Sequence, residues 1–166
     1  MHIVLESLAD SDGPEILDIF NYYAENSFAA YSLQPLPDEM ACMFLDLSNG
    51  YPAVIARDES GTAVGFGLLR PFSPMPAFAA TAEITLFLRN GYTGHGIGKV
   101  ILSHLIEQAT EIGLVSVLAS ISSLNEGSLR FHLRNGFQEC GRFREAGEKL
   151  GKRFDVVYCQ RMMGNG

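Results

Sequence analysis

The segment Leu86-Phe87-Leu88-Arg89-Asn90-Gly91-Tyr92-Thr93-Gly94-His95-Gly96-Ile97-Gly98-Lys99 joins an apolar strand pattern to an amphipathic helix pattern through a glycine-rich turn. The glycines at 94, 96 and 98 leave main-chain N–H groups uncovered by side chains, and a helix dipole adds positive potential at the same point. Such a turn can bind a pyrophosphate without many cationic side chains. A merely flexible strand–helix connection would contain the same glycines, so the motif alone leaves both interpretations open.

The glycine spacing differs from two common phosphate-binding motifs. A Walker loop continues from its second glycine to Lys and then Ser or Thr, whereas Gly98-Lys99 is followed by Val100. A dinucleotide-binding turn has the pattern G-x-G-x-x-G after the first strand of a domain. Here the third glycine comes one residue early and the turn lies in mid-chain. A nucleotide-binding protein of either kind is therefore disfavoured.

The hydrophobic patterns on both sides of this turn predict an α/β domain built on a mixed sheet. Their order is βααβββαβαββ. The helices are expected at residues 14–26, from 37 onward, at 96–111 and at 125–135. The strands are expected at residues 2–7, 52–58, 62–70, 79–88, 114–121, 137–145 and 153–162.

The length and composition predict a single domain over residues 1–166. Hydrophobic residues make up 47% of the chain, enough for a sizeable core, and no apolar run is long enough to span a membrane. The start of the chain lacks the pattern of a secretory signal. The 3 cysteines are widely spaced and fit neither a disulfide framework nor a metal site. We therefore expect a cytoplasmic protein without a membrane partner and without a bound metal.

The net charge of −7 argues against a general nucleic-acid partner, which usually requires a basic patch. The charge is nevertheless unevenly spread, since residues 120–166 contain eight Lys or Arg and five Asp or Glu. This local excess of positive charge fits a wall that meets a small anionic ligand. It is equally compatible with ordinary variation of surface charge.

Four segments in order resemble the GCN5-related N-acetyltransferases (GNAT family), and most closely the subgroup similar to phosphinothricin acetyltransferase. The turn Tyr92–Gly98 resembles the acyl-CoA pyrophosphate loop of the family, and Thr81–Leu88 resembles the strand before it. Residues 125–137 resemble an Asn-x-x-Ser…His…Gly-Phe helix, and 147–156 resemble a Gly-x-Lys-x-Gly-x-Trp-x-Asp-Val ending. The resemblance is strong over residues 81–160 and weak before residue 50.

The resemblance implies a GNAT fold, in which two central parallel strands splay apart and the sheet is flanked by helices. It also implies acetyl-CoA as co-substrate, with its pantetheine arm in the splay and its pyrophosphate on the glycine turn. The cofactor-binding residues that it implies are Leu86, Phe87, Leu88, Thr93, Gly94, His95, Gly96, Ile97, Gly98, Lys99, Asn125 and Ser128.

Glu83 is the catalytic base that the resemblance implies. It is a lone carboxylate in the apolar strand pattern 79–88. Burial raises the pKa of a carboxylate, and a base poised near neutral pH suits proton removal from an ammonium group, directly or through water. Period-two counting places Glu83 on one face with Thr81 and Thr85, which fits either a substrate cleft or a solvated surface.

His132 is the second candidate catalytic residue. The family often has a Tyr at this position, which can protonate the departing thiolate, and the phosphinothricin-type members have His there. A histidine can donate such a proton near pH 7. A histidine on the helix surface, paired with a neighbour, would give the same sequence.

The acceptor side departs from the family pattern. Thr93 replaces the usual Arg or Gln of the loop, and residues 72–78 lack the arginines that phosphinothricin-type members carry there. A guanidinium normally binds a carboxylate or phosphinate, so its absence favours a neutral or more apolar amine. The candidate substrate-binding residues are Phe28, Tyr31, Phe72 and Glu83 itself, although the aromatic ones would look the same as core residues.

These features predict an acetyl-CoA-dependent N-acetyltransferase that transfers the acetyl group directly to the primary amine of a small molecule, either an amino-acid-like or a neutral amine. The alternative is a non-catalytic CoA- or acyl-CoA-binding module of the same fold. Relatives are often homodimers, but the sequence leaves the oligomeric state open. It also leaves open the identity of the amine and the length of the acyl group.

Overall fold

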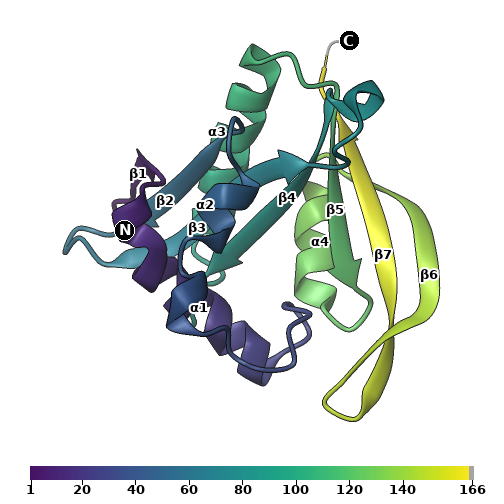
Figure 1. Cartoon of the computed structure of the whole chain (residues 1–166), viewed down its shortest axis with the longest axis horizontal. Helices are drawn as coiled ribbons and strands as arrows, with labels where there is room; N and C mark the ends of the chain where they lie inside the picture. Colours follow the sequence, from purple (N-terminus) through teal and green to yellow (C-terminus); the bar gives the residue numbers. More distant parts are fainter. Residues whose placement is uncertain (165–166) are drawn as a thin grey trace.

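The computed structural model describes residues 1–164. They form a seven-stranded mixed sheet in the order β1-β2-β3-β4-β5-β7-β6 with four α-helices around it (Figure 1). The strands are β1 (Val4–Ser7), β2 (Ala53–Arg57), β3 (Ala63–Pro71), β4 (Thr81–Leu88), β5 (Ser116–Ser122), β6 (Gln138–Lys149) and β7 (Lys152–Met162). The helices are α1 (Gly13–Asn26), α2 (Met43–Leu47), α3 (Ile97–Glu111) and α4 (Glu126–Arg134). The predicted mixed sheet is confirmed.

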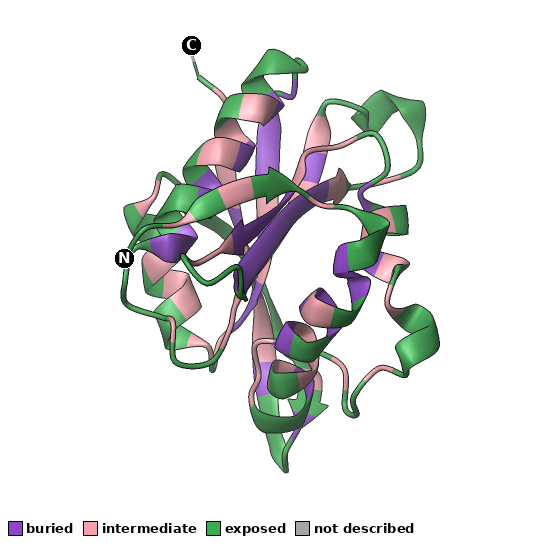
Figure 2. Cartoon of the chain, turned by 90° about the vertical axis from the view of Figure 1, so that its left-hand side faces the viewer, coloured by how far each residue is buried: buried purple, intermediate pink, exposed green. Residues whose placement is uncertain are grey.

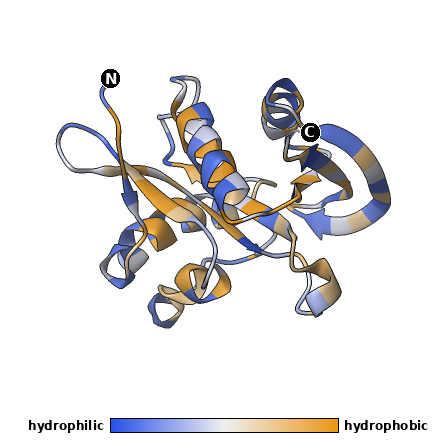
Figure 3. Cartoon of the chain, turned by 90° about the horizontal axis from the view of Figure 1, so that it is seen from above, coloured by the Kyte–Doolittle hydropathy of each residue, from blue (hydrophilic) through white to orange (hydrophobic). Residues whose placement is uncertain are grey.

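Helices α1 and α2 cover one face of the sheet, and α3 and α4 cover the other (Figure 1). Each face has its own apolar core, and the buried residues gather on the central strands and the inward sides of the helices (Figure 2). Hydrophobic residues likewise run along the central strands in Figure 3. Two glycines of β3 let α3 lie close to the sheet, since a Cβ on Gly67 would be 2.5 Å from Ile101. The sheet thereby holds the start of α3 next to the end of β4.

The second predicted helix begins later than the start predicted near residue 37, and it is short. Residues Asp38–Met40 form a single 3-10 turn, and α2 itself spans only Met43–Leu47. Phe44 is its one buried side chain, so little apolar surface is available to hold a longer helix against the sheet. The Ser48 hydroxyl donates to the Leu45 carbonyl at the end of α2.

The closing hairpin is longer than expected. Strand β6 continues to Lys149 through a register shift between Phe143 and Gly147, instead of ending near residue 145. Such a bulge lets a strand bend while its pairing continues. Within residues 1–164, no helix is long and apolar enough to cross a bilayer, and no group of three potential metal-ligating side chains lies together.

Candidate active site

The parallel strands β4 and β5 pair only where they begin. The register joins Thr81 to Ser116 and ends at the pair Glu83–Leu118, although β4 continues to Leu88 and β5 to Ser122. The two strands diverge from that point (Figure 1). The splayed parallel pair expected from the resemblance is therefore present, and Glu83 lies at its vertex.

Alternate residues of β4 direct their main-chain groups into this splay. The Thr81 carbonyl accepts from the Phe72 N–H at 3.2 Å, so the odd-numbered residues direct these groups toward β3. Because the direction alternates along a strand, Leu86 and Leu88 direct theirs toward the unpaired edge. The Leu88 carbonyl already accepts a hydrogen bond from the Tyr23 hydroxyl. The remaining edge groups can receive an extended ligand as an added strand.

Phe87 lies outside this set of edge groups. It pairs with Phe66 of β3, and its ring packs 5.4 Å from the rings of Phe20 and Tyr23 on the α1 side of the sheet. The same alternation that exposes Leu86 and Leu88 turns the main chain of Phe87 away from the splay. We therefore remove Phe87 from the candidate cofactor contacts.

The glycine turn after β4 is open and positively polarised. Gly94 and Gly96 have φ values of +80° and +82°, a backbone region that residues with a Cβ seldom adopt. A Cβ on either would meet nothing within 4 Å. No side chain caps α3, and the N–H groups of Ile97, Gly98 and Lys99 make no hydrogen bonds within residues 1–164. These N–H groups are available to an anion.

The side chains of the turn contribute less than its main chain. Thr93, His95 and Lys99 are exposed, and only Lys99 carries a full positive charge. The Ile97 side chain is buried in the core, so this residue can offer a ligand only its N–H group. The turn therefore offers an anion mainly its main-chain N–H groups.

The beginning of α4 lies on the other side of the splay, after β5. The Asn125 side chain caps α4 by accepting from the Ser128 N–H at 3.3 Å. The Ser128 hydroxyl lies 3.3 Å from Nδ1 of His132. Both Asn125 and Ser128 are half-buried, which leaves part of each side chain accessible.

His132 is buried between two aromatic rings, those of Phe131 and Phe137. Its Nδ1 lies 2.8 Å from the Ser128 carbonyl oxygen, which can only accept, so Nδ1 carries the hydrogen. Burial lowers the pKa of His132 and so favours the neutral ring. In that tautomer Nε2 has no proton to give, which argues against the expected role of His132 as the acid for the thiolate.

Glu83 is not the isolated carboxylate that its sequence context predicts. Arg70 lies directly opposite it on β3, and Nη2 of Arg70 donates to Oε2 of Glu83 at 2.7 Å. The Glu83 side chain is 13% exposed and the Arg70 side chain is 37% exposed, so the carboxylate is better shielded from water than the guanidinium. Residues opposite each other on neighbouring strands share a face, which brings two residues 13 positions apart in sequence into contact.

Aromatic side chains from distant segments gather beside this ion pair. Tyr31 stacks on Phe154 with ring centroids 5.7 Å apart, and its hydroxyl lies 3.2 Å from that of Ser120 on β5. Burial raises the pKa of Tyr31, and the negative charge of Glu83 contributes in the same direction. Phe28 also packs on Phe154, at 5.9 Å. The structure thus brings Phe28 and Tyr31 to the Glu83 side of the splay.

The connection between β3 and β4 forms an exposed apolar edge. Phe72 packs against Phe78 at 5.7 Å, and both rings are exposed, as is Met75. Phe72 comes directly after the end of β3 and two residues after Arg70. Its N–H donates to the Thr81 carbonyl at 3.2 Å, which keeps it next to the start of β4, and its substrate-binding role stays a prediction.

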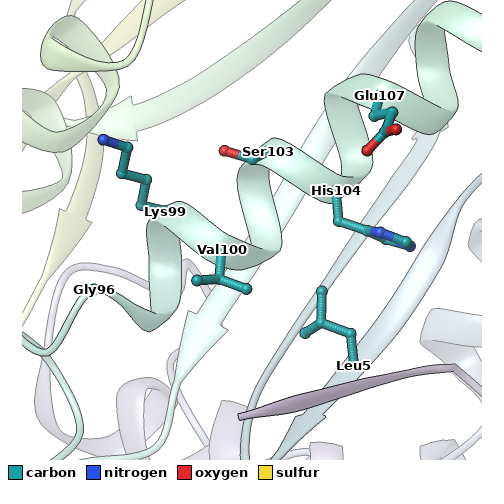
Figure 4. Close-up of a pocket in the computed structure, with 7 residues that line it drawn as sticks. All are labelled: Leu5, Gly96, Lys99, Val100, Ser103, His104 and Glu107. Carbon is teal, nitrogen blue, oxygen red and sulfur yellow. The ribbon is translucent and has the colours of Figure 1, made fainter. Parts of the chain in front are cut away.

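A shallow depression lies beside the turn, on the outer side of α3 (Figure 4). Leu5 of β1 forms one side of it, and the α3 segment from Gly96 to Glu107 forms the other. None of its lining residues comes from β4 or β5. It is therefore separate from the splay and does not reach Glu83.

Four residues near the splay were not predicted from the sequence: Arg70, Ser120, Tyr23 and Lys149. Lys149 is buried and donates to the carbonyls of Ala30 at 2.7 Å and Tyr23 at 3.2 Å. The only sequence signal for Arg70 was its place as a lone arginine ending an apolar strand pattern. The others depend on contacts between segments far apart in the chain.

Comparison with known proteins agrees with this geometry. The model of the acetyltransferase (GNAT) family matches residues 16–137. The L-methionine sulfoximine/L-methionine sulfone acetyltransferase of Pseudomonas aeruginosa is 32% identical over 152 residues, which cover 90% of this chain and 88% of that protein. The phosphinothricin N-acetyltransferase of Streptomyces coelicolor is 30% identical, with 92% and 91% covered.

A solved structure extends the comparison to three dimensions. The phosphinothricin acetyltransferase of Sinorhizobium meliloti, in complex with AcCoA, superimposes with a TM-score of 0.93 at 31% identity, covering 100% of this chain and 91% of that one. Together with the splayed parallel pair and the uncapped glycine turn, these comparisons identify the chain as an N-acetyltransferase. It belongs to the acetyltransferase (GNAT) family, within the subgroup similar to phosphinothricin acetyltransferase.

Proposed function

We propose that this chain transfers the acetyl group of acetyl-CoA directly to the primary amine of a small, amino-acid-like molecule. The observation that carries the proposal is the position of Glu83, which is the last residue of β4 that pairs with β5. The splay that begins there leads along β4 to the uncapped turn at Gly94–Gly98. Acetyl-CoA would lie along the free edge of β4, with its pyrophosphate at the turn and its acyl group near Glu83.

The main chain supplies most of the proposed cofactor contacts. The N–H groups from Gly94 to Lys99 would hold the pyrophosphate, and the edge groups of Leu86 and Leu88 would hold the pantetheine arm. Asn125 and Ser128 would contact the arm from the side of α4. The exposed side chains of Thr93 and His95 would add side-chain contacts to the cofactor at the turn.

The proposed chemistry needs one base. Glu83 accepts a proton from the ammonium group of the acceptor, directly or through a water molecule. The free amine attacks the thioester carbonyl, a main-chain N–H of β4 stabilises the oxyanion, and the C–S bond then breaks. The proton taken up by Glu83 can pass on to the thiolate. His132 would then have a structural role within α4, since its Nδ1 is bound to the Ser128 carbonyl and its Nε2 carries no hydrogen.

Two measurements test this proposal in sequence. Isothermal titration with acetyl-CoA should show binding at or below millimolar concentration, and no binding would reject the proposal. Release of free CoA thiol should then be measured with a panel of small primary amines. Binding without thiol release from any class of amine would favour the alternative of a non-catalytic acyl-CoA-binding module.

We also place the reaction in the cytoplasm and propose a homodimer. All 3 cysteines are free, as expected in a reducing compartment. Phe143, Leu150 and Met162 of the closing hairpin are exposed apolar side chains that a second copy could cover. Light scattering coupled to size-exclusion chromatography measures the molar mass directly, and a monomer at high concentration would contradict the dimer.

A further inference from the structure

The hydroxyl groups of Tyr31 and Ser120 lie 3.2 Å apart beside the β4–β5 splay. Tyr31 comes from the segment after α1, and Ser120 comes from β5, 89 positions later in the chain. Two hydroxyl groups have two hydrogens, and the bond between them uses one. The other hydrogen is donated to no protein group within residues 1–164. Neither side chain is fully buried, so the pair can give this hydrogen to a ligand.

Ser120 and Glu83 lie on the same face of the sheet. Ala119, the neighbour of Ser120 in β5, belongs to the core cluster that packs on α3. Ala82, the neighbour of Glu83 in β4, belongs to the same cluster. Because successive side chains of a strand alternate between the two faces, Ser120 and Glu83 both point to the side of α1. The hydroxyl pair and the proposed base therefore face the same space.

The register of the parallel strands places Ser120 beyond the vertex of the splay. The last pair joins Glu83 to Leu118, so a continued ladder would place Ser120 opposite Thr85. Both strands run in the direction in which the splay widens. A thioester whose acyl carbon lies near Glu83 has its sulfur one bond further from the vertex. The sulfur is then at the level of Ser120.

We propose that the hydroxyl groups of Tyr31 and Ser120 bind the sulfur of CoA as it leaves as a thiolate. This inference rests on the proposed function and adds to it a binding site for the leaving group. When the C–S bond breaks, its electron pair goes to the sulfur, and the free hydroxyl hydrogen of the pair forms a charge-assisted hydrogen bond to it. The thiolate then takes up the proton that Glu83 removed from the ammonium group.

The leaving sulfur needs a donor, because a charge without a partner is costly in a site shielded from water. His132 is not that donor, since its Nδ1 hydrogen is bonded to the Ser128 carbonyl and its Nε2 carries none. The main-chain N–H groups of β4 are assigned above to the arm and the oxyanion. The hydroxyl pair, by contrast, has a hydrogen to give at the level of the sulfur.

The test measures how the affinity for CoA depends on its thiol group, without an acceptor and without turnover. Isothermal titration gives the affinities for CoA and for desulfo-CoA, which lacks the sulfur, at about pH 7 and about pH 9.5, a range in which thiols ionise. In the wild type the ratio of the CoA affinity to the desulfo-CoA affinity should rise by about fivefold or more over this range. The reason is that the thiolate gains a charge-assisted hydrogen bond that the thiol lacks.

The double variant Tyr31→Phe/Ser120→Ala removes both hydroxyl groups but keeps the ring that stacks on Phe154. It should bind desulfo-CoA with wild-type affinity, and its affinity ratio should rise by less than about twofold. The matched control is Tyr22→Phe/Ser116→Ala. It removes a tyrosine hydroxyl from α1 and a serine hydroxyl from the same face of β5, where β5 still pairs with β4. The control should keep the wild-type rise.

The ionisable groups around the pair are the same in the wild type and in the double variant, so their effect on the bound thiol cancels. They are Glu83 on β4, Arg70 on β3, Tyr158 on β7 and Lys149 on β6. Burial raises the pKa of Tyr31 above its ordinary value of about 10, and the charge of Glu83 adds to the rise. The Tyr31 hydroxyl therefore keeps its hydrogen over the range of the titration.

Three results would overturn the sulfur site: no rise in the wild type, a rise that survives in the double variant, or a rise that the control also loses. Loss of desulfo-CoA binding in the double variant would overturn it as well, since the hydroxyl pair would then serve only the fold. Failure of the wild type to bind either compound would overturn the proposed function, and this inference with it. The two failures are therefore distinguishable.

Discussion

Gly98 in the first turn of α3 lies directly against the ring of Phe131 in α4. A Cβ built on Gly98 would be 3.3 Å from two carbons of that ring, closer than side chains normally pack. The contact joins the two helices that begin on opposite sides of the β4–β5 splay. The N–H groups of the turn and the side chains at the start of α4 therefore have a fixed relative position.

Gly98→Ala should be less stable than Gly127→Ala by about 1–3 kcal/mol, because the added methyl group overpacks the contact with Phe131. Gly127 is the matched control, since it is also helical and a Cβ there would meet nothing within 4 Å. Alanine in place of glycine otherwise favours a helix by about 1 kcal/mol. Urea denaturation of both variants measures the difference, and equal stabilities would contradict the packing argument.

Gly96→Ala should weaken acetyl-CoA binding by about tenfold, beyond its effect on stability. The alanine would strain the backbone at φ +82° and so disturb the N–H groups of the turn that would receive the pyrophosphate. Gly61→Ala is the control, because Gly61 has φ +85° and equally open surroundings in the distant β2–β3 turn. Both variants should lose about 1–2 kcal/mol of stability. Isothermal titration with acetyl-CoA distinguishes the two variants, and equal affinities for acetyl-CoA would contradict the anion-binding role of the turn.

Glu83→Gln should lower kcat by about 100-fold or more while acetyl-CoA affinity stays unchanged, since the amide cannot accept the proton. The control is Glu107→Gln on the exposed side of α3, which should retain wild-type turnover. Thiol release should be measured with a competent amine from about pH 6 to pH 9. Turnover near the wild-type rate throughout that range would show that Glu83 is not the base.

His132 should make the protein less stable in mild acid. Burial lowers the pKa of His132 in the folded protein, whereas in the unfolded chain this histidine titrates near pH 6.5. The unfolded state therefore binds more protons between these two pKa values, and the free energy of unfolding falls as the pH falls through that window. His132→Asn should show a shallower loss, whereas the exposed His95→Asn should match the wild type. Urea denaturation at several pH values checks this, and identical slopes would contradict it.

Lys149→Met should lower the free energy of unfolding by about 1–3 kcal/mol, because the carbonyls of Ala30 and Tyr23 lose their buried donor. The variant should also raise KM for the amine. Ala30 precedes Tyr31, so the loss should loosen the aromatic segment beside Glu83. The exposed Lys152 of the same hairpin provides the control, Lys152→Met, with an expected effect below about 0.5 kcal/mol. Unfolding and steady-state kinetics measure both, and similar values for the two variants would contradict the anchoring role.

Local patterns in the sequence predicted the elements that position the site. The order of strands and helices is as expected, because apolar periodicity and glycine turns act within a few residues. Helix α2 begins at Met43 and not near residue 37, and Phe44 is its one buried residue. The main-chain direction at Phe87 follows from strand alternation once the register is known.

The sequence by itself determined the uncapped glycine turn after β4 and the carboxylate of Glu83 upstream of it, because these features depend on residue type and short spacing. Only the tertiary structure decided which groups surround that carboxylate. Arg70 reaches it through the pairing of β3 with β4, Tyr31 meets Ser120 across 89 positions, and Lys149 meets Ala30 across 119. Such contacts arise from strand register and the packing of distant segments, which no local pattern of residues encodes.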